Sequence, residues 1–75
     1  MISKKLIKMI NDLKTNEKII LSTLGGLDSI VIVKKNGFIA VIYNNVNVNL
    51  FLSTAELICA FGNTIVECRT DLINF

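Results

Sequence analysis

The stretch that decides the fold is Ile30-Val31-Ile32-Val33-Lys34-Lys35-Asn36-Gly37-Phe38-Ile39-Ala40-Val41-Ile42-Tyr43. An Asn-Gly pair between two apolar runs is the strongest short-range signal for a β-hairpin. Half-buried antiparallel strands alternate apolar and polar residues, whereas these two runs are apolar at nearly every position. The predicted hairpin therefore has two apolar faces, and each of them needs a cover.

The whole chain is short and apolar. Its 75 residues are enough for one domain, which we expect to span residues 1–75. Hydrophobic residues make up 52% of the chain and charged residues only 19%. A domain of this size buries only about 60% of the surface that its unfolded chain exposes. The excess of apolar residues therefore indicates either an unusually rich core or an apolar surface that binds something.

Several features favour a cytoplasmic protein without a membrane partner. The apolar runs are far shorter than the roughly 18 residues that a spanning helix needs. The first eight residues carry lysines but no apolar segment typical of a signal peptide, and neither end has a lipidation motif. The two cysteines, Cys59 and Cys68, are too few for a disulfide framework, so we expect two reduced thiols.

The periodicity of the sequence predicts an α+β fold. Residues 3–14 have the apolar spacing of an amphipathic helix that Ser3 caps, and Ser53 with Glu56 forms a capping box that starts a second helix ending at Gly62. Strands are expected at residues 17–24, 28–35, 38–43, 46–50 and 64–70. The predicted architecture is an antiparallel four- to five-stranded β-meander with both helices packed on one face, in the order α-β-β-β-β-α-β.

Two-residue turns at Gly25-Gly26, Asn36-Gly37 and Asn44-Asn45 would fix the register of the four strands. Glu17 would then lie opposite Lys34. One face of the sheet becomes almost wholly apolar, and we expect the helices to cover it. Its predicted members are Ile19, Leu21, Ile30, Ile32, Ile39, Val41, Tyr43, Val46, Val48 and Leu50.

The opposite face is predicted to be an apolar island with a polar rim. The island consists of Ile20, Val31, Val33, Phe38, Ala40 and Ile42, and the rim of Lys18, Ser22, Ser29, Lys35, Asn47 and Asn49. This arrangement is typical of an interaction surface. We therefore expect a protein-interaction module that self-associates through this face, with a homodimer as the first choice.

The composition argues against an enzyme. The chain has no histidine, which removes Ser-His-Asp and Cys-His catalysis, and two cysteines cannot by themselves form a structural zinc site. The six acidic residues each have a structural explanation, such as a helix surface, a turn or a capping box. Gly25-Gly26 precedes a strand instead of a helix, so it predicts a plain turn and not a phosphate site. No catalytic residue, metal or cofactor is expected.

The lysines indicate an alternative function, in which the protein is a small regulator that binds nucleic acid. The net charge is only +2, but all of the lysines lie in the first half of the chain. They are Lys4, Lys5, Lys8, Lys14, Lys18, Lys34 and Lys35. Contacts between these groups and phosphates would give binding that weakens with salt. Aromatic residues for base stacking are few.

The order of a helix, a three-stranded meander and a second helix is similar to that of some small phage proteins that inhibit CRISPR nucleases. The segment from Leu13-Lys14 to Lys34 and Asn36-Gly37 is the closest part. The resemblance implies a host protein as partner, although those inhibitors are typically acidic and this chain is slightly basic. Together with the Lys-, Asn- and Ile-rich composition, it suggests a viral or mobile-element protein that modulates a host protein. It assigns no functional residues.

Overall fold

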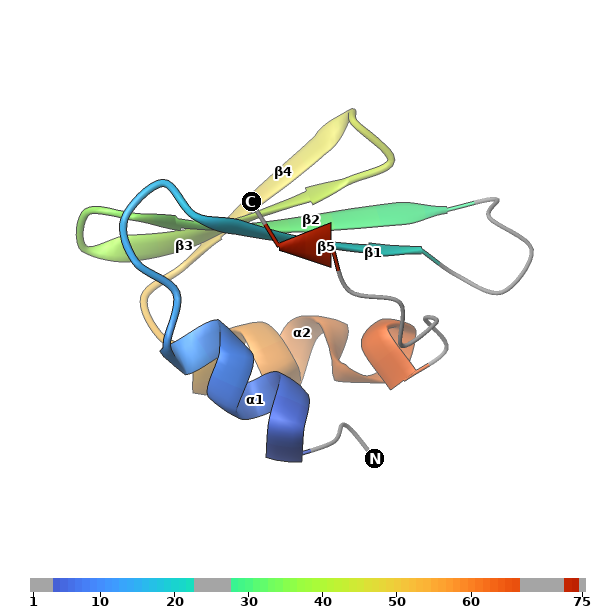
Figure 1. The fold of residues 1–75 in the computed structure, drawn as a ribbon. Helices are drawn as coiled ribbons and strands as arrows, with labels where there is room; N and C mark the ends of the chain where they lie inside the picture. The colour runs from blue at the N-terminus through green and yellow to red at the C-terminus, as the bar shows by residue number, and fades with distance from the viewer. Residues whose placement is uncertain (1–3, 23–27, 67–72, 75) are drawn as a thin grey trace.

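A computed structural model describes residues 4–22, 28–66 and 73–74 of the chain. Within these residues two helices lie on one side of an antiparallel sheet, which confirms the predicted α+β architecture (Figure 1). The elements are α1 (Lys4–Asn11), β1 (Lys18–Ser22), β2 (Ser29–Lys35), β3 (Phe38–Tyr43), β4 (Asn47–Phe51), α2 (Thr54–Val66) and β5 (Ile73–Asn74). The predicted Ser3 cap and the Gly25-Gly26 turn lie outside the described residues.

The strands follow one another across the sheet in the order β4-β3-β2-β1-β5. The central pair is the predicted hairpin: Lys35 lies opposite Phe38 and Ile32 opposite Val41, so the loop is Asn36-Gly37. Gly37 has a φ of 88°, a conformation that side chains disfavour. Strand β1 pairs with β2 in the predicted register, with Ile19 opposite Ile32.

The C-terminal part differs from the prediction. The fifth strand is predicted at residues 64–70, but residues 64–66 belong to α2, which continues to Val66, and residues 67–70 lie outside the described residues. Strand β5 pairs antiparallel with β1 at the other edge of the sheet. Gly62 therefore lies inside the helix instead of ending it. A glycine in a helix costs about 1 kcal/mol relative to alanine. Burial of Ile65, two turns beyond Leu57 on the same face of α2, offsets that cost.

The start of α2 agrees with the predicted capping box. The Ser53 hydroxyl accepts a hydrogen bond of 3.2 Å from the Glu56 amide, and the Glu56 carboxylate accepts one of 2.7 Å from the Leu52 amide. Both bonds satisfy backbone N–H groups that the first helical turn leaves without partners. The Thr54 hydroxyl donates to the Asn11 side chain and so links the two helices.

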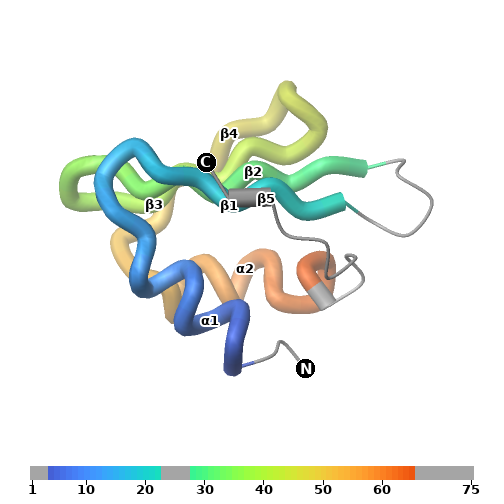
Figure 2. The backbone as a smooth tube through the Cα atoms, viewed as in Figure 1, coloured from blue at the N-terminus to red at the C-terminus, as the bar shows by residue number. Residues whose placement is uncertain are grey.

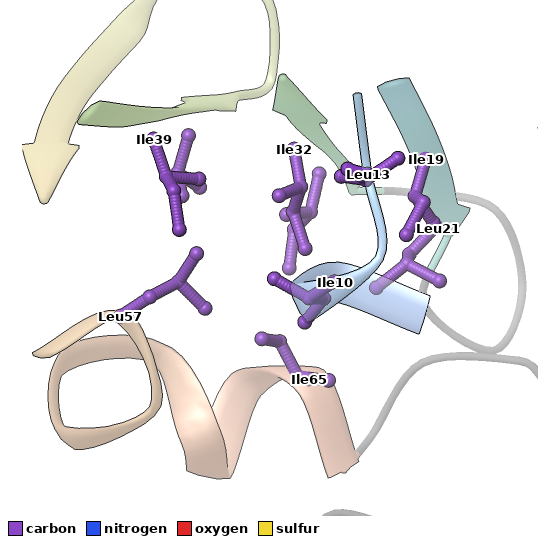
Figure 3. Packing of buried hydrophobic residues seen from close by; sticks show 10 residues of the cluster. Ile10, Leu13, Ile19, Leu21, Ile32, Ile39, Leu57 and Ile65 are labelled. Atoms are coloured by element: carbon purple, nitrogen blue, oxygen red, sulfur yellow. The ribbon is translucent and has the colours of Figure 1, made fainter. Parts of the chain in front are cut away.

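The core fills the space between the sheet and the helices (Figure 3). Alternate residues of β1, β2 and β3 point toward the helices, among them Ile19, Ile32 and Ile39, and all three are buried. Ile10 of α1 with Leu57 and Ile65 of α2 meet them from the other side. In Figure 2 the traces of α1 and α2 run below the same face of the sheet, and the opposite face carries no described helix.

The register of β4 is shifted by one residue from the prediction. Tyr43 lies opposite Asn47 and Ile39 opposite Phe51, so three residues separate β3 from β4 and not two. Asn44 and Asn45 both have positive φ, at 53° and 61°, and Asn is one of the few residues that accept this conformation.

A one-residue shift moves every side chain of a strand to the other face. The prediction that Val46, Val48 and Leu50 lie on the helix-covered face is therefore wrong. Phe51 takes that place, with its ring 5.9 Å from the ring of Phe61 in an edge-to-face contact. A large aromatic side chain gains more from burial than the smaller side chains it replaces.

Asn44 fixes the turn through its side chain. Its amide oxygen accepts a 2.8 Å hydrogen bond from the Ser29 amide, and its amide nitrogen donates a 2.8 Å bond to the Asp28 carboxylate. The backbone N–H of Asn44 also donates to the Ser29 carbonyl, at 2.9 Å. The side-chain oxygen of Asn44 thus accepts the Ser29 hydrogen bond that a backbone carbonyl would accept if the pairing of β2 with β3 continued.

We expect the Asn44→Ala variant to lose about 1–3 kcal/mol of unfolding free energy relative to Asn45→Ala, because a half-buried donor and acceptor lose their partner. Both substitutions place alanine at positive φ, so the difference isolates the side-chain hydrogen bonds. Urea unfolding followed by circular dichroism measures it. Equal losses in the two variants would show that the bonds contribute nothing.

Two leucines near the start of α2 test where the core ends. Leu57 is fully buried, whereas Leu52, which precedes the cap residue Ser53 at the position of a hydrophobic staple, is 79% exposed. Leu57→Ala should cost about 2–5 kcal/mol, and Leu52→Ala should stay within about 0.5 kcal/mol. Urea unfolding at dilute protein concentration compares them, and a comparable loss for Leu52→Ala would restore the staple.

Candidate interaction surface

The sheet has one face that the described helices do not cover, and we call it the outer face. All six residues predicted for the island lie on it: Ile20 of β1, Val31 and Val33 of β2, and Phe38, Ala40 and Ile42 of β3. Direct cross-strand pairs hold them together, with Val33 opposite Ala40 and Val31 opposite Ile42. The predicted island therefore forms one continuous patch.

The shifted register of β4 enlarges this patch. Leu50 lies opposite Ala40 and Val48 opposite Ile42, so two apolar residues predicted for the core belong to the outer face. Two apolar rows now cross the sheet from β4 toward β1. One row is Leu50, Ala40 and Val33, and the other is Val48, Ile42, Val31 and Ile20. Sequence reasoning missed both β4 residues because it assigned the wrong turn length.

Exposure increases across the outer face toward β4. Val33 and Ala40 at its centre are 9% and 7% exposed. Ile20, Val31, Phe38 and Ile42 are half-buried. Val48 and Leu50 are 60% and 64% exposed. The part of the surface most available to a partner is therefore the β4 side.

The rim of the outer face is only partly as predicted. Lys18 and Lys35 border the apolar rows at one end and Ser22 and Ser29 at the other. Asn47 and Asn49 were predicted to be on the same rim. They lie opposite Tyr43 and Val41 and so point to the helix side of β4, where both are exposed. This prediction was wrong for the same reason as that for Val48 and Leu50.

The β3–β4 hairpin is electrically neutral. No charged residue occurs between Lys35 and Glu56, a run that contains all of β3 and β4. The turn and β4 instead carry asparagines, which keep the segment polar without charge. A surface of this kind offers no charge to a partner, so binding there depends on shape, apolar contact and neutral hydrogen bonds.

The lysines lie in two groups. Three are exposed on α1, where Lys8 pairs with Asp12 at 3.4 Å. The other group lies where the α1–β1 connection meets the end of β2: the Asn16 amide donates to the Lys34 carbonyl at 2.7 Å, and Lys35 Nζ donates to the Asn16 side chain at 3.3 Å. This second group is Lys14, Lys18, Lys34 and Lys35.

The acidic groups of the described residues are engaged in local contacts. Besides Asp12 and Glu56, Asp28 accepts from Asn44, and the Glu17 carboxylate accepts a 2.8 Å bond from the Lys14 amide. The predicted pairing of Glu17 with Lys34 is present in the backbone, where the Lys34 amide donates to the Glu17 carbonyl at 3.1 Å. Within residues 4–22, 28–66 and 73–74, no group of three or more potential metal ligands occurs.

Cys59 is exposed on α2 as a free thiol, while Cys68 lies outside the described residues. Neither helix, as far as the structure describes them, is long and apolar enough to span a bilayer. Comparisons of the chain with protein-family models, curated proteins and solved structures found no match.

Proposed function

We propose that this protein is a non-enzymatic interaction module that self-associates through the outer face of its sheet. The observation that carries the proposal is the continuity of that face: eight apolar residues on four strands, with no described helix over them. An apolar patch of this extent on a small protein is typical of a protein–protein contact.

The distribution of exposed surface also supports association. Fully burying a valine or leucine side chain contributes about 1.5–3 kcal/mol, whereas association costs roughly 4–15 kcal/mol in lost motional freedom. No single side chain of the outer face offsets that cost. Association therefore requires that several side chains become buried at once, namely the two β4 residues and the half-buried residues of β1, β2 and β3. Contact between two such faces would bury them together.

A second copy is the partner that we favour, because it brings an identical neutral apolar surface. The same face would also fit a host protein. That this chain is a viral or mobile-element protein that inhibits such a host protein stays a prediction made from the sequence. The two cases differ in an observable way: self-association requires only the purified chain.

Light scattering coupled to size exclusion tests the proposal. At tens of micromolar we expect an apparent mass of twice the 8.3 kDa of the chain. Val48→Lys should shift the mass to that of the monomer, because it places a charge in the apolar contact. Asn63→Lys, at an exposed position of α2 on the other side of the sheet, should leave the mass unchanged.

Both positions are exposed, so neither variant should change the monomer's stability by more than about 0.5 kcal/mol. Circular dichroism confirms that both variants remain folded. A wild-type chain that stays monomeric at these concentrations would remove self-association from the proposal.

The alternative function, nucleic-acid binding, is supported by one observation. The contacts around Asn16 bring four lysines to one end of the sheet, although the chain carries a net charge of only +2. Such a cluster would contact phosphates without reading sequence.

Binding to duplex DNA or RNA at low salt tests this alternative by fluorescence anisotropy. If the lysines act, the affinity should fall steeply with salt, and Lys34→Glu combined with Lys35→Glu should abolish it. Lys4→Glu combined with Lys5→Glu, on α1, makes the same change in net charge and tests whether the helix lysines also contribute. No binding by the wild-type chain at low salt would exclude the alternative.

A further inference from the structure

Strand β4 forms one edge of the sheet, and it lacks the features that usually prevent edges from pairing. An edge strand presents unpaired N–H and C=O groups, which natural proteins protect with charges, proline or very short strands. Strand β4 has five residues, Asn47–Phe51, with neither charge nor proline among them. The opposite edge strand, β5, has only two residues.

Exposed apolar side chains are concentrated along this edge. Among the described residues, four large hydrophobic side chains are exposed, and all four lie in β4 or directly beside it. They are Val46, Val48, Leu50 and Leu52. They alternate with asparagine and phenylalanine along the chain, so they follow the two-residue period of a strand.

We infer that β4 pairs antiparallel with β4 of a second copy about a two-fold axis at Asn49, so that two sheets become one. The inference rests on the proposed function, since it takes the second copy as the partner. A neutral edge sets no like charges against each other when it meets itself. A two-fold contact also uses the edge of both chains and therefore closes at the dimer.

The positions of the exposed residues select the axis. Residues directly opposite each other in a sheet point to the same face. Two copies of one strand meet this condition only when one residue lies opposite its own copy, so the two-fold axis must pass between the two copies of a single residue. With the axis at Asn49, Val48 lies opposite Leu50 of the other copy and Val46 opposite Leu52, which pairs all four exposed residues. An axis at Val48 would set Leu52 against Asn44, and an axis at Leu50 would set Val46 against Thr54.

Asn49 suits the position on the axis. Its side chain is exposed on the helix side of β4, and the amide has both a donor and an acceptor. Two asparagines opposite each other can therefore hydrogen-bond reciprocally, which favours this register over its neighbours.

The direction of β4 connects the edge with the outer face. Figure 1 shows the β3–β4 hairpin rising from the sheet on the side away from the helices. A copy paired along this edge continues the sheet toward the outer face. In the register proposed above, edge pairing brings Val48 and Leu50 of the outer face side by side with Leu50 and Val48 of the second copy.

Disulfide trapping tests the register. In the Cys59→Ser, Cys68→Ser background, Asn49→Cys places two cysteines directly opposite, at Cα separations of about 4.5–5.5 Å, within the range of roughly 4.4–6.8 Å that a disulfide spans. Val48→Cys in the same background is the control, because its copy lies diagonally, at about 7–8 Å. Under copper-catalysed air oxidation, Asn49→Cys should run at twice its mass on non-reducing gels and Val48→Cys at the monomer mass.

A second variant tests the same axis without oxidation. Asn49→Lys places two ammonium groups opposite each other and should raise the monomer fraction in light scattering, whereas Asn45→Lys in the turn should not. Circular dichroism checks that each variant is folded.

The outcomes separate the inference from the proposed function. A wild-type dimer in which Asn49→Cys forms no disulfide, or in which only Val48→Cys does, overturns edge pairing and leaves association through the outer face. Species larger than a dimer also overturn the closed two-fold contact. A wild-type chain that is monomeric at tens of micromolar overturns both proposals.

Discussion

The antiparallel pairing of β2 with β3 is the constraint on which the rest of the structure depends. It brings Ile32 and Val41 to one face and Val33 and Ala40 to the other, and all four are buried. Because strand side chains alternate, this register decides which residues α1 and α2 must cover and which they leave outside. The turn at Gly37 sets it, and β1 extends it with Ile19 opposite Ile32. Burial of Leu57 and Ile65 then fixes α2 on the inner face.

Much of this arrangement could be predicted from the sequence, because its signals are local. Asn36-Gly37 and the capping box at Ser53 and Glu56 each specify a backbone geometry within a few residues, and the structure has both. The register of β4 could not be predicted in the same way. Val-Asn-Val-Asn-Leu alternates equally well in either register, and the choice depends on the contact of Phe51 with Phe61, which is remote in sequence. The end of α2 failed similarly, since burial of Ile65 outweighs the local signal of Gly62.

The candidate site shows the same division. The six island residues lie together as predicted because they follow from the β2–β3 and β1–β2 registers. Val48 and Leu50, the most exposed members of the outer face, follow from β4 alone and were assigned to the wrong side. An error of one residue in a turn therefore left the centre of the surface correct and hid the part most accessible to a partner. Composition had indicated either an unusually rich core or a remaining apolar surface.

The neutral run from Asn36 to Ala55 has a consequence for regulation. It holds no aspartate, glutamate or histidine, the side chains that take up protons on mild acidification. Contacts made by this hairpin are therefore insensitive to mild acidification. The fraction of associated chains would rise with the amount of protein synthesised. In the proposed assembly, the concentration of the protein would therefore be the variable that controls association.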